Sequence, residues 1–463
     1  MDKATYDLIV IGSGPAGQKG AIAAAKLGKK VAVIDRKGML GGVSLHTGTI
    51  PSKTLREAVM YMTGFRQRAF YGSDYSLKEK VSKEDLSARV RTVLERELEV
   101  VRHQFRRNEV TVIQGSACFL DPHTIVAPTD AGDAQLSAEK ILIACGTRPA
   151  RDPMIPFDGQ TVIDAGELES LAEIPKDLIV VGAGVIGIEY ASMCAALEVR
   201  VTVIEQRAEI LDFVDREIVE HLQYHLRDLG VIFRFGEKVL SVEKDSRGAV
   251  VATLESGKTV AGAALLYAVG RQSNADLLKL EAAGVPLDNR GRIGVNEHFQ
   301  TAIPHIYAAG DVIGFPALAA TSMEQGRLAA CHMFGAHSTN STSPLPYGVY
   351  TIPEISMIGK TERQLTEEKI PYEVGIARYE ELARGQILGD QTGRLKLLFD
   401  PRDLKLLGIH IIGEGATELL HIGQAIMNTG ATIEYFRDTV FNYPTLAEAY
   451  KVAALNGLNK LRN

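Results

Sequence analysis

The sequence predicts an α/β protein in which two similar β-α-β units precede a separate α+β region. Three observations support this fold class. Two glycine-rich turns each follow a short apolar segment, and each turn is followed by an apolar helix pattern and a second apolar segment. The last part of the chain, beyond a polar linker, shows strand patterns followed by helix patterns.

Length and composition are typical of a soluble protein with several domains. The 463 residues correspond to about three domains at roughly 150 residues each. With 51 Lys and Arg against 57 Asp and Glu, the net charge is −6, which argues against a broad nucleic-acid-binding surface. No apolar run approaches the roughly 18 residues of a membrane-spanning helix, and the N-terminus lacks a signal-peptide pattern. We therefore expect a cytoplasmic protein with neither nucleic-acid nor membrane partners.

The cysteines and histidines predict no metal site. Four cysteines are widely separated along the chain, so neither a disulfide framework nor a CxxC zinc site is expected. His221 and His225 are four residues apart on a predicted helix, but no third ligand lies close in sequence. A solvated or edge-packed helix face accounts for them better.

The first β-α-β unit contains a dinucleotide-binding signature. Tyr6–Ile11 is a predicted buried strand, Gly12–Gly17 has the pattern GxGxxG, and Val31–Asp35 is the second strand after an alanine-rich helix. In this signature the first glycine permits the tight turn, the second lets the backbone approach a pyrophosphate, and the third allows close helix–strand packing. The helix N-terminus favours the phosphates electrostatically.

The second unit repeats this pattern in the same register. Leu178–Val181 precedes the GxGxxG turn Gly182–Gly187, and a helix through Cys194 leads to the strand Val201–Glu205. One GxGxxG is a weak signal, but two copies, each with an acidic residue 23 positions after its first glycine, predict two dinucleotide sites. The alternative is a pair of glycine turns in an α/β protein that binds no nucleotide.

The acidic residues that end the second strands indicate which nucleotides bind. Asp35 and Glu205 are placed to accept hydrogen bonds from a ribose, which at Glu205 favours NAD. Arg207, two residues further on, is the residue type that pairs with the 2′-phosphate of NADP. Together they predict tolerance of both coenzymes, unless Arg207 is simply a solvated surface charge.

The C-terminal third has a different organisation. The polar segment His337–Pro344 is a predicted linker. Beyond it, strands are expected at Arg394–Phe399 and Gly408–Ile412, and helices at Glu418–Met427 and Ala447–Leu455. These elements predict a third, α+β domain.

Over nearly its whole length the chain resembles the pyridine nucleotide–disulfide oxidoreductase family. The resemblance rests on both GxGxxG turns and on the segments Gly41–Lys53, Ala144–Pro149 and Ala308–Asp311. It implies FAD in the first Rossmann-like unit, NAD or NADP in the second, and a homodimer or higher homo-oligomer formed through the third domain. The expected domains are residues 1–150 and 271–343 for FAD, 151–270 for NAD(P), and 344–463 for dimerisation.

The resemblance also implies the roles of individual residues. Asp311 would hold the ribityl chain, Lys53 and Glu189 (in the turn after Gly187) would pair beside flavin N5, and the helix after Leu318 would direct its N-terminus at flavin N1. The FAD-binding residues expected are Gly12, Ser13, Gly14, Gly17, Asp35, Arg36, Gly42, Thr49, Lys53, Gly146, Gly310, Asp311, Leu318 and Ala319. The NAD(P)-binding residues expected are Gly182, Gly184, Gly187, Glu205, Arg207 and Gly270. The catalytic residues expected are Lys53, Glu189, Tyr443 and Glu448.

The sequence departs from the family at its redox centre. The family's two cysteines in C-x4-C correspond to Ser44 and Thr49, and its histidine before a proline corresponds to Tyr443. A hydroxyl cannot cycle between thiol and disulfide, and a tyrosine with a pKa near 10 is a poor proton shuttle at neutral pH. Ser44 and His46, two apart in an extended segment, do not form a nucleophile–base pair either.

A flavin without a dithiol exchanges electrons directly with nicotinamides or with an external acceptor. The segments His46–Lys53 and Phe441–Tyr450 resemble those of the Si-specific, transhydrogenating members of the family. The expected reaction is NADPH + NAD⁺ ⇌ NADP⁺ + NADH, by a ping-pong route through enzyme-bound FAD. The alternatives are an NAD(P)H:quinone or diaphorase-type reductase and a catalytically silent, flavin-bound regulatory protein.

Overall fold

The computed structural model describes residues 4–72, 74–130, 132–168, 171–338 and 344–461. The chain forms two compact units. Unit 1 comprises residues 1–55, 87–150 and 270–341, and unit 2 comprises residues 56–86, 151–269 and 342–463. The expected three-domain division stays a prediction, and most of the expected linker, residues 339–343, lies outside the described residues.

Unit 1 is built on one mixed sheet. In sheet order the strands are β3 (Thr111–Gln114), β2 (Val31–Asp35), β1 (Ala4–Ile11), β6 (Gly132–Ile143), β5 (Thr124–Thr129) and β4 (Cys118–Asp121), with β17 (Ile306–Ala308) also on β6. The strand β1 is parallel to both neighbours, and its residues Leu8, Ile9 and Val10 are fully buried. Burial on both faces explains the apolar run Leu8–Ile11 that ends this strand.

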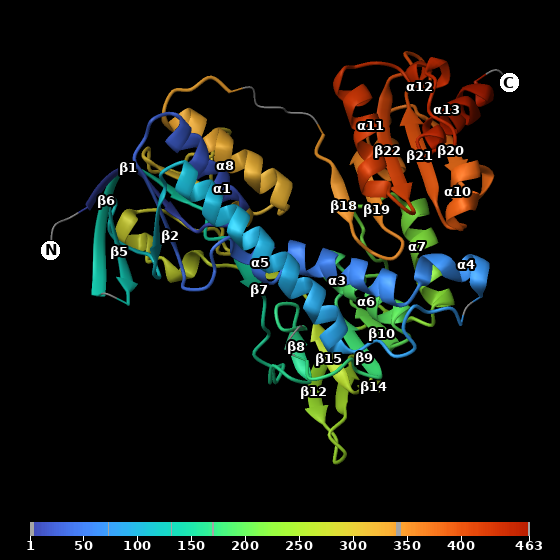
Figure 1. The fold of residues 1–463 in the computed structure, drawn as a ribbon, viewed down its shortest axis with the longest axis horizontal. Helices are drawn as coiled ribbons and strands as arrows, with labels where there is room; N and C mark the ends of the chain where they lie inside the picture. Colours follow the sequence, from blue (N-terminus) through green and yellow to red (C-terminus); the bar gives the residue numbers. More distant parts are fainter. Residues whose placement is uncertain (1–3, 73, 131, 169–170, 339–343, 462–463) are drawn as a thin grey trace. The chain divides into compact units, whose positions relative to one another are not determined.

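Two helices of unit 1 lie side by side in Figure 1, α1 (Pro15–Lys26) and α8 (Ala319–Met333). Small residues allow this close approach: a Cβ atom on Gly326 would lie 2.0 Å from the carbonyl oxygen of Ala16. The contact brings the N-terminal part of α1 against α8, although the two helices are about 300 residues apart in sequence.

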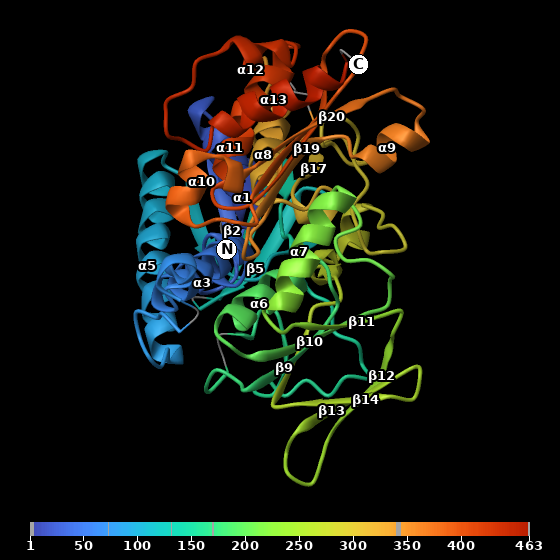
Figure 2. The same cartoon turned by 90° about the vertical axis from the view of Figure 1, so that its right-hand side faces the viewer.

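The first part of unit 2 is a parallel sheet. Its strand order is β11 (Ile232–Phe235), β10 (Arg200–Glu205), β9 (Asp177–Val181), β15 (Ala264–Tyr267) and β8 (Val162–Asp164). Helices α6 (Val185–Ala196) and α7 (Arg216–Asp228) lie on one side of this sheet in Figure 2. An antiparallel sheet follows, formed by β12 (Val239–Lys244), β13 (Val250–Leu254) and β14 (Thr259–Gly262).

The C-terminal part of unit 2 is an antiparallel sheet. Its order is β18 (Tyr347–Val349), β19 (Ile355–Gly359), β22 (Leu406–Ile412), β21 (Arg394–Phe399) and β20 (Glu373–Arg378). Helices α11 (Ala416–Asn428) and α13 (Glu448–Lys460) pack against it. The α/β fold class with two Rossmann-like units and an α+β C-terminal domain is confirmed, and the two expected C-terminal strands lie at β21 and β22.

Among the described residues, no helix combines the length and the apolar character needed to cross a membrane.

Candidate active site

The first glycine turn packs the start of α1 directly onto the end of β1. Gly12 has a φ of +101°, and a Cβ atom there would lie 2.3 Å from the carbonyl oxygen of Ala144. A Cβ atom on Gly17 would lie 1.9 Å from the carbonyl oxygen of Gly12. Gly42, with φ +68°, faces Gly14, and a Cβ atom on it would lie 2.7 Å from the Gly14 Cα. At these three positions a side chain would collide with backbone, so glycine keeps the backbone of the turn open to the close approach of a pyrophosphate.

Asp35, the last residue of β2, holds this turn in place. Its Oδ2 accepts hydrogen bonds from the backbone N of Ser13 at 2.7 Å and from the Ser13 hydroxyl at 2.5 Å. Its Oδ1 accepts from the backbone N of Arg36 at 2.7 Å. The Ser13 hydroxyl in turn accepts from the backbone N of Gly41 at 2.8 Å. One carboxylate thus joins the glycine turn to the segment that carries Gly42.

A pocket adjoins Asp35 at the same edge of the sheet. It is lined by Asp35, Arg36, Gly38, Leu40, Leu98, Arg102, Val112 and Gln114. Leu98 and Arg102 come from helix α5 (Lys83–Arg107), and Val112 and Gln114 from β3. These four residues were not predicted as site residues, because the sequence gives no sign that α5 and β3 lie beside β2.

The second glycine turn has the same geometry in unit 2. Gly182 has a φ of +98°, and a Cβ atom on Gly187 would lie 2.0 Å from the carbonyl oxygen of Gly182. Glu205 Oε2 accepts from the backbone N of Ala183 at 2.7 Å, as Asp35 accepts from Ser13. Gly184 has open space around its Cα. The matching geometry supports a second nucleotide cradle.

Arg207 is paired rather than merely solvated. Its Nε lies 3.1 Å from Glu205 Oε1, and its Nη1 lies 3.1 Å from Asp212 Oδ2. Burial by itself would raise the pKa of Glu205, but the hydrogen bonds from Arg207 and Ala183 outweigh it and keep that pKa below its ordinary value. Glu205 is therefore an ionised acceptor at neutral pH.

The segment around Asp311 completes the polar framework of unit 1. The Thr147 hydroxyl donates to Asp311 Oδ2 at 3.1 Å, and Arg271 Nε donates to the Thr147 hydroxyl at 2.7 Å. The backbone N of Gly310 donates to the Gln325 side chain at 2.9 Å. Thr147, Arg271 and Gln325 were not predicted as site residues, because each acts through a contact between distant segments.

The expected flavin helix begins where the sequence suggested. Helix α8 starts at Ala319, with Leu318 as its N-cap. Gly146 and Gly270 both have left-handed φ values, +63° and +81°, and a Cβ atom would meet nothing at either position. Their roles toward a cofactor stay predictions.

Glu189 lies in a helix, so its expected place in a turn is wrong. Helix α6 begins at Val185, and Glu189 is its fifth residue, with only 4% of its surface exposed. Glu189 Oε1 accepts from the backbone N of Tyr350 at 2.8 Å.

Lys53 lies in α3 (Thr49–Met62), where its Nζ donates to the Ser52 hydroxyl at 3.3 Å. Because Lys53 and Glu189 belong to different units, their pairing stays a prediction.

The segment with Ser44 and His46 is also helical, so the expected extended conformation is wrong. The left-handed Gly41 (φ +94°) precedes the short helix α2 (Gly42–His46), which is followed by α3 from Thr49. The Ser44 hydroxyl donates to the Gly41 carbonyl at 3.3 Å, and His46 Nε2 contacts the Leu40 carbonyl at 2.8 Å. Both side chains thus bond to nearby backbone.

The two residues expected near the C-terminus differ in exposure. Tyr443 is 74% exposed, and Glu448 is the half-buried first residue of α13. A catalytic role for either stays a prediction. Cys145 lies just after β6, and burial raises the pKa of its thiol to about 12. It is therefore a protonated thiol at neutral pH.

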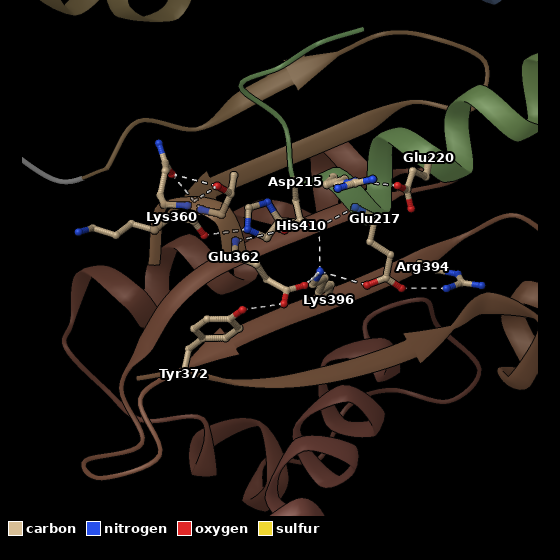
Figure 3. Close-up of polar contacts among 12 residues, drawn as sticks. Asp215, Glu217, Glu220, Lys360, Glu362, Tyr372, Arg394, Lys396 and His410 are labelled. Atoms are coloured by element: carbon tan, nitrogen blue, oxygen red, sulfur yellow. Dashed lines mark hydrogen bonds and ion pairs between the residues drawn. The ribbon is translucent and has the colours of Figure 1, made fainter. Parts of the chain in front are cut away.

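Unit 2 contains a second cluster of ionisable groups around Lys396. In Figure 3 the Lys396 ammonium points toward the carboxylates of Asp215, Glu217 and Glu362. Its Nζ lies 2.8 Å from Asp215 Oδ1 and 3.0 Å from Glu217 Oε2, and it also pairs with Glu362. These carboxylates lie close enough together to hold a cation, and the ammonium occupies that position.

His410 of β22 lies beside this cluster and is fully buried. Its Nε2 contacts the Lys360 carbonyl at 2.9 Å, and its Nδ1 has no hydrogen-bond partner among the described residues. Burial lowers the pKa of His410, although the nearby Asp215 carboxylate acts in the opposite direction. His410 is therefore neutral in the folded protein near pH 7.

We expect His410 to make the protein less stable in acid. The unfolded chain takes up a proton on His410 below about pH 6.5, whereas the folded chain resists it, so the free energy of unfolding falls as pH drops through that range. In His410→Gln, which keeps an Nε2 donor, the decline between about pH 7 and about pH 5.5 should be smaller. Urea unfolding at both pH values measures the free energy of unfolding of the two proteins. Equal declines would contradict the conclusion that His410 stays neutral in the folded protein.

Two glycine cradles, each closed by a carboxylate, fit two dinucleotides with diphosphates. The polar framework around Asp311 in unit 1 fits the larger cofactor, FAD, and the Glu205–Arg207 pair in unit 2 fits NAD or NADP. Fold and site thus define a flavin- and pyridine-nucleotide-dependent oxidoreductase.

More narrowly, the chain belongs to the pyridine nucleotide-disulphide oxidoreductase family. The family's sequence profile matches residues 6–326, and that of the family's dimerisation domain matches residues 345–454.

Similar proteins are found among both curated sequences and solved structures. The chain is 56% identical to a soluble pyridine nucleotide transhydrogenase of Mycobacterium tuberculosis, over 99% of this chain and 98% of the relative. It is 46% identical to a protein of the same name from an Enterobacter species, over 98% of each chain. The structure of LpdA from Mycobacterium tuberculosis superposes with a TM-score of 0.89 at 26% identity, covering 98% of this chain and 99% of LpdA. The flavoprotein disulfide reductase RclA from Escherichia coli gives 0.88 at 28% identity, with the same coverage.

Proposed function

We propose that this protein is an FAD-dependent NAD(P)⁺ transhydrogenase that catalyses NADPH + NAD⁺ ⇌ NADP⁺ + NADH. The observation that carries the proposal is the combination of two dinucleotide cradles with a segment, Gly41–Lys53, that contains no cysteine. By the resemblance to the family, Ser44 and Thr49 would take the places of its two redox cysteines. Electrons delivered to such a site must leave it directly, and a second nicotinamide is the acceptor that the other cradle can bind. Relatives named soluble pyridine nucleotide transhydrogenase, at 46–56% identity, support this choice.

The residues of the chain bind and orient the reactants. FAD, when bound, supplies a group that can take a pair of electrons from one nicotinamide and return it to another. The Gly14–Gly42 cradle and the Asp35 network would hold its diphosphate half, and Asp311, fixed by Thr147, would hold its ribityl chain. If both nicotinamide coenzymes use the cradle at Gly182–Gly187, the product nucleotide must leave before the second substrate enters. A ping-pong order follows from this.

The choice of electron acceptor tests the proposal. Purified holoenzyme is mixed with NADPH and either thio-NAD⁺, whose reduction has its own absorbance, or a soluble quinone. We expect fast thio-NAD⁺ reduction and slow quinone reduction. Preferential quinone reduction would contradict the proposal and indicate an NAD(P)H:quinone reductase instead. Failure of NADPH to bleach the flavin would indicate a flavin-bound protein without this activity.

Arg207→Ala should weaken NADP(H) binding more than NAD(H) binding. The Nε of its guanidinium lies 3.1 Å from Glu205 Oε1, and Glu205 would accept from the ribose of either coenzyme. Loss of a charge-assisted contact to a 2′-phosphate should raise the Kd of NADPH by about tenfold. Protein-bound nucleotide fluorescence measures both Kd values, and an equal change in the two would contradict dual recognition. Arg234→Ala, on the neighbouring strand β11, is the matched control.

We also infer a homodimer, because the C-terminal part matches a dimerisation domain. The exposed Tyr443 would then face the partner subunit. Light scattering tests the mass, and a monomer at micromolar concentration would contradict the inference. The cytoplasmic location stays a prediction.

A further inference from the structure

The loop that joins β10 to α7, residues 206–215, carries the charges that would select the coenzyme. Arg207 lies near its start, and Asp212, which pairs with Arg207, lies further along. The residue after strand β11 also contacts the loop, since the backbone N of Gly236 donates to the Arg207 carbonyl at 3.3 Å. The loop belongs to the nucleotide-binding part of unit 2, yet residues of the C-terminal part hold it at three points.

The first and most buried point is Asp215, the N-cap of α7. Its Oδ1 accepts from the backbone N of Glu217 and from Lys396 Nζ, the latter at 2.8 Å. Lys396 comes from β21, and the side chains of Lys396 and Asp215 are only 2% and 1% exposed. The backbone N of Glu362 donates to Asp215 Oδ2 at 3.4 Å. Removing one partner of such a buried pair leaves an uncompensated charge, which is strongly destabilising. The contact between Lys396 and Asp215 should therefore stay formed in the folded protein.

Two further contacts hold the middle of the loop. Arg363 Nη2 lies 2.7 Å from Glu209 Oε2, with both side chains about half exposed. The rings of Phe213 and Tyr347 lie 5.1 Å apart between centroids. The C-terminal part thus contacts the loop through an ion pair, a ring contact and the buried anchor.

Glu205 and Arg207, the two residues that would select the coenzyme, are held in place by different contacts. Glu205 is part of β10 and bonds to the backbone of Ala183, so the sheet and the glycine turn fix it without the loop. Arg207 lies in the loop. Its Nε bonds to Glu205, but the second partner of its guanidinium, Asp212, is carried by the loop, so the direction of the guanidinium depends on the loop's path. Loosening the loop should therefore disturb a contact to a 2′-phosphate while leaving a contact to the ribose hydroxyls intact.

We propose that Lys396 is a positioning residue for coenzyme selection: by holding Asp215 it fixes the loop that presents Arg207 to the 2′-phosphate of NADP(H). The C-terminal domain would then serve nucleotide recognition as well as assembly. This inference rests on the proposed function, because it requires Arg207 to recognise that phosphate.

Two fragments of the coenzymes test the proposal without any electron transfer. Calorimetry on the holoenzyme compares 2′,5′-ADP, which carries the 2′-phosphate, with 5′-AMP, which lacks it. In Lys396→Met we expect the Kd of 2′,5′-ADP to rise by about tenfold, with little change for 5′-AMP. Equal weakening of both ligands, or of neither, would overturn the proposal. Lys405→Met, whose ammonium is exposed and pairs with Asp403, is the matched control.

A milder variant covers the case in which Lys396→Met does not fold. Glu209→Gln breaks the exposed contact with Arg363 and should raise the Kd of 2′,5′-ADP by about threefold, again without change for 5′-AMP. No selective change in this variant would then overturn the proposal. A wild-type protein that binds 2′,5′-ADP no better than 5′-AMP would instead show that NADP recognition itself fails.

Discussion

Gly187→Ala is expected to keep its flavin but to bind NADPH much more weakly. The added Cβ atom would lie 2.0 Å from the carbonyl oxygen of Gly182, a backbone atom that cannot rotate away. Helix α6 must therefore move off the end of β9, which opens the nucleotide cradle. Overpacking of this kind costs about 1–3 kcal/mol, which corresponds to a Kd for NADPH about tenfold to hundredfold higher. Anaerobic titration of the yellow protein with NADPH measures it.

The equivalent substitution in the first glycine turn should impair flavin binding. In Gly17→Ala the Cβ atom would lie 1.9 Å from the carbonyl oxygen of Gly12, so the protein should lose its flavin and purify with little or no colour. Gly294→Ala, where a Cβ atom meets nothing, is the control and should change neither property. Colour retained in Gly17→Ala, or tight NADPH binding in Gly187→Ala, would contradict the assignment of the two cradles.

Gly184, the middle glycine of the second turn, distinguishes a clash within the protein from a clash with the bound nucleotide. A Cβ atom on Gly184 meets no protein atom within 4 Å. Gly184→Ala should therefore keep the melting temperature of the wild type, and any weaker binding of NADPH reports the methyl group against the nucleotide itself.

Glu189→Gln is expected to slow the reduction of the flavin by NADPH by about tenfold to hundredfold. Glutamine has nearly the same shape and keeps an oxygen that can accept from the backbone of Tyr350, so the fold should be preserved while the charge is lost. Stopped-flow absorbance under anaerobic conditions gives the rate. Glu198→Gln, an exposed residue paired with Arg68, is the control and should leave the rate unchanged.

A double variant tests whether Glu189 acts together with Lys53. If the two charges form a pair, Lys53→Met combined with Glu189→Gln should be hardly slower than the slower single variant. Multiplicative effects of the two changes would show that they act separately. Unchanged rates in both single variants would remove them from the reaction altogether.

The sequence alone determined the two βαβ units and the residues that close each turn. Gly12 and Gly17 contact each other across a single turn of chain, and Gly182 and Gly187 do the same. Asp35 and Glu205 follow at the end of the next strand, where parallel pairing places them beside the turn. All these contacts arise within one β-α-β unit, so residue type and spacing suffice to specify them.

Only the tertiary structure decided what surrounds those turns. Glu189 is helical and bonded to Tyr350, the pocket beside Asp35 includes residues of α5, and Lys396 holds the loop of Arg207. Each of these contacts joins segments far apart in the chain. Their existence depends on how sheets and helices pack, and spacing along the sequence contains no information on which distant side chains then meet.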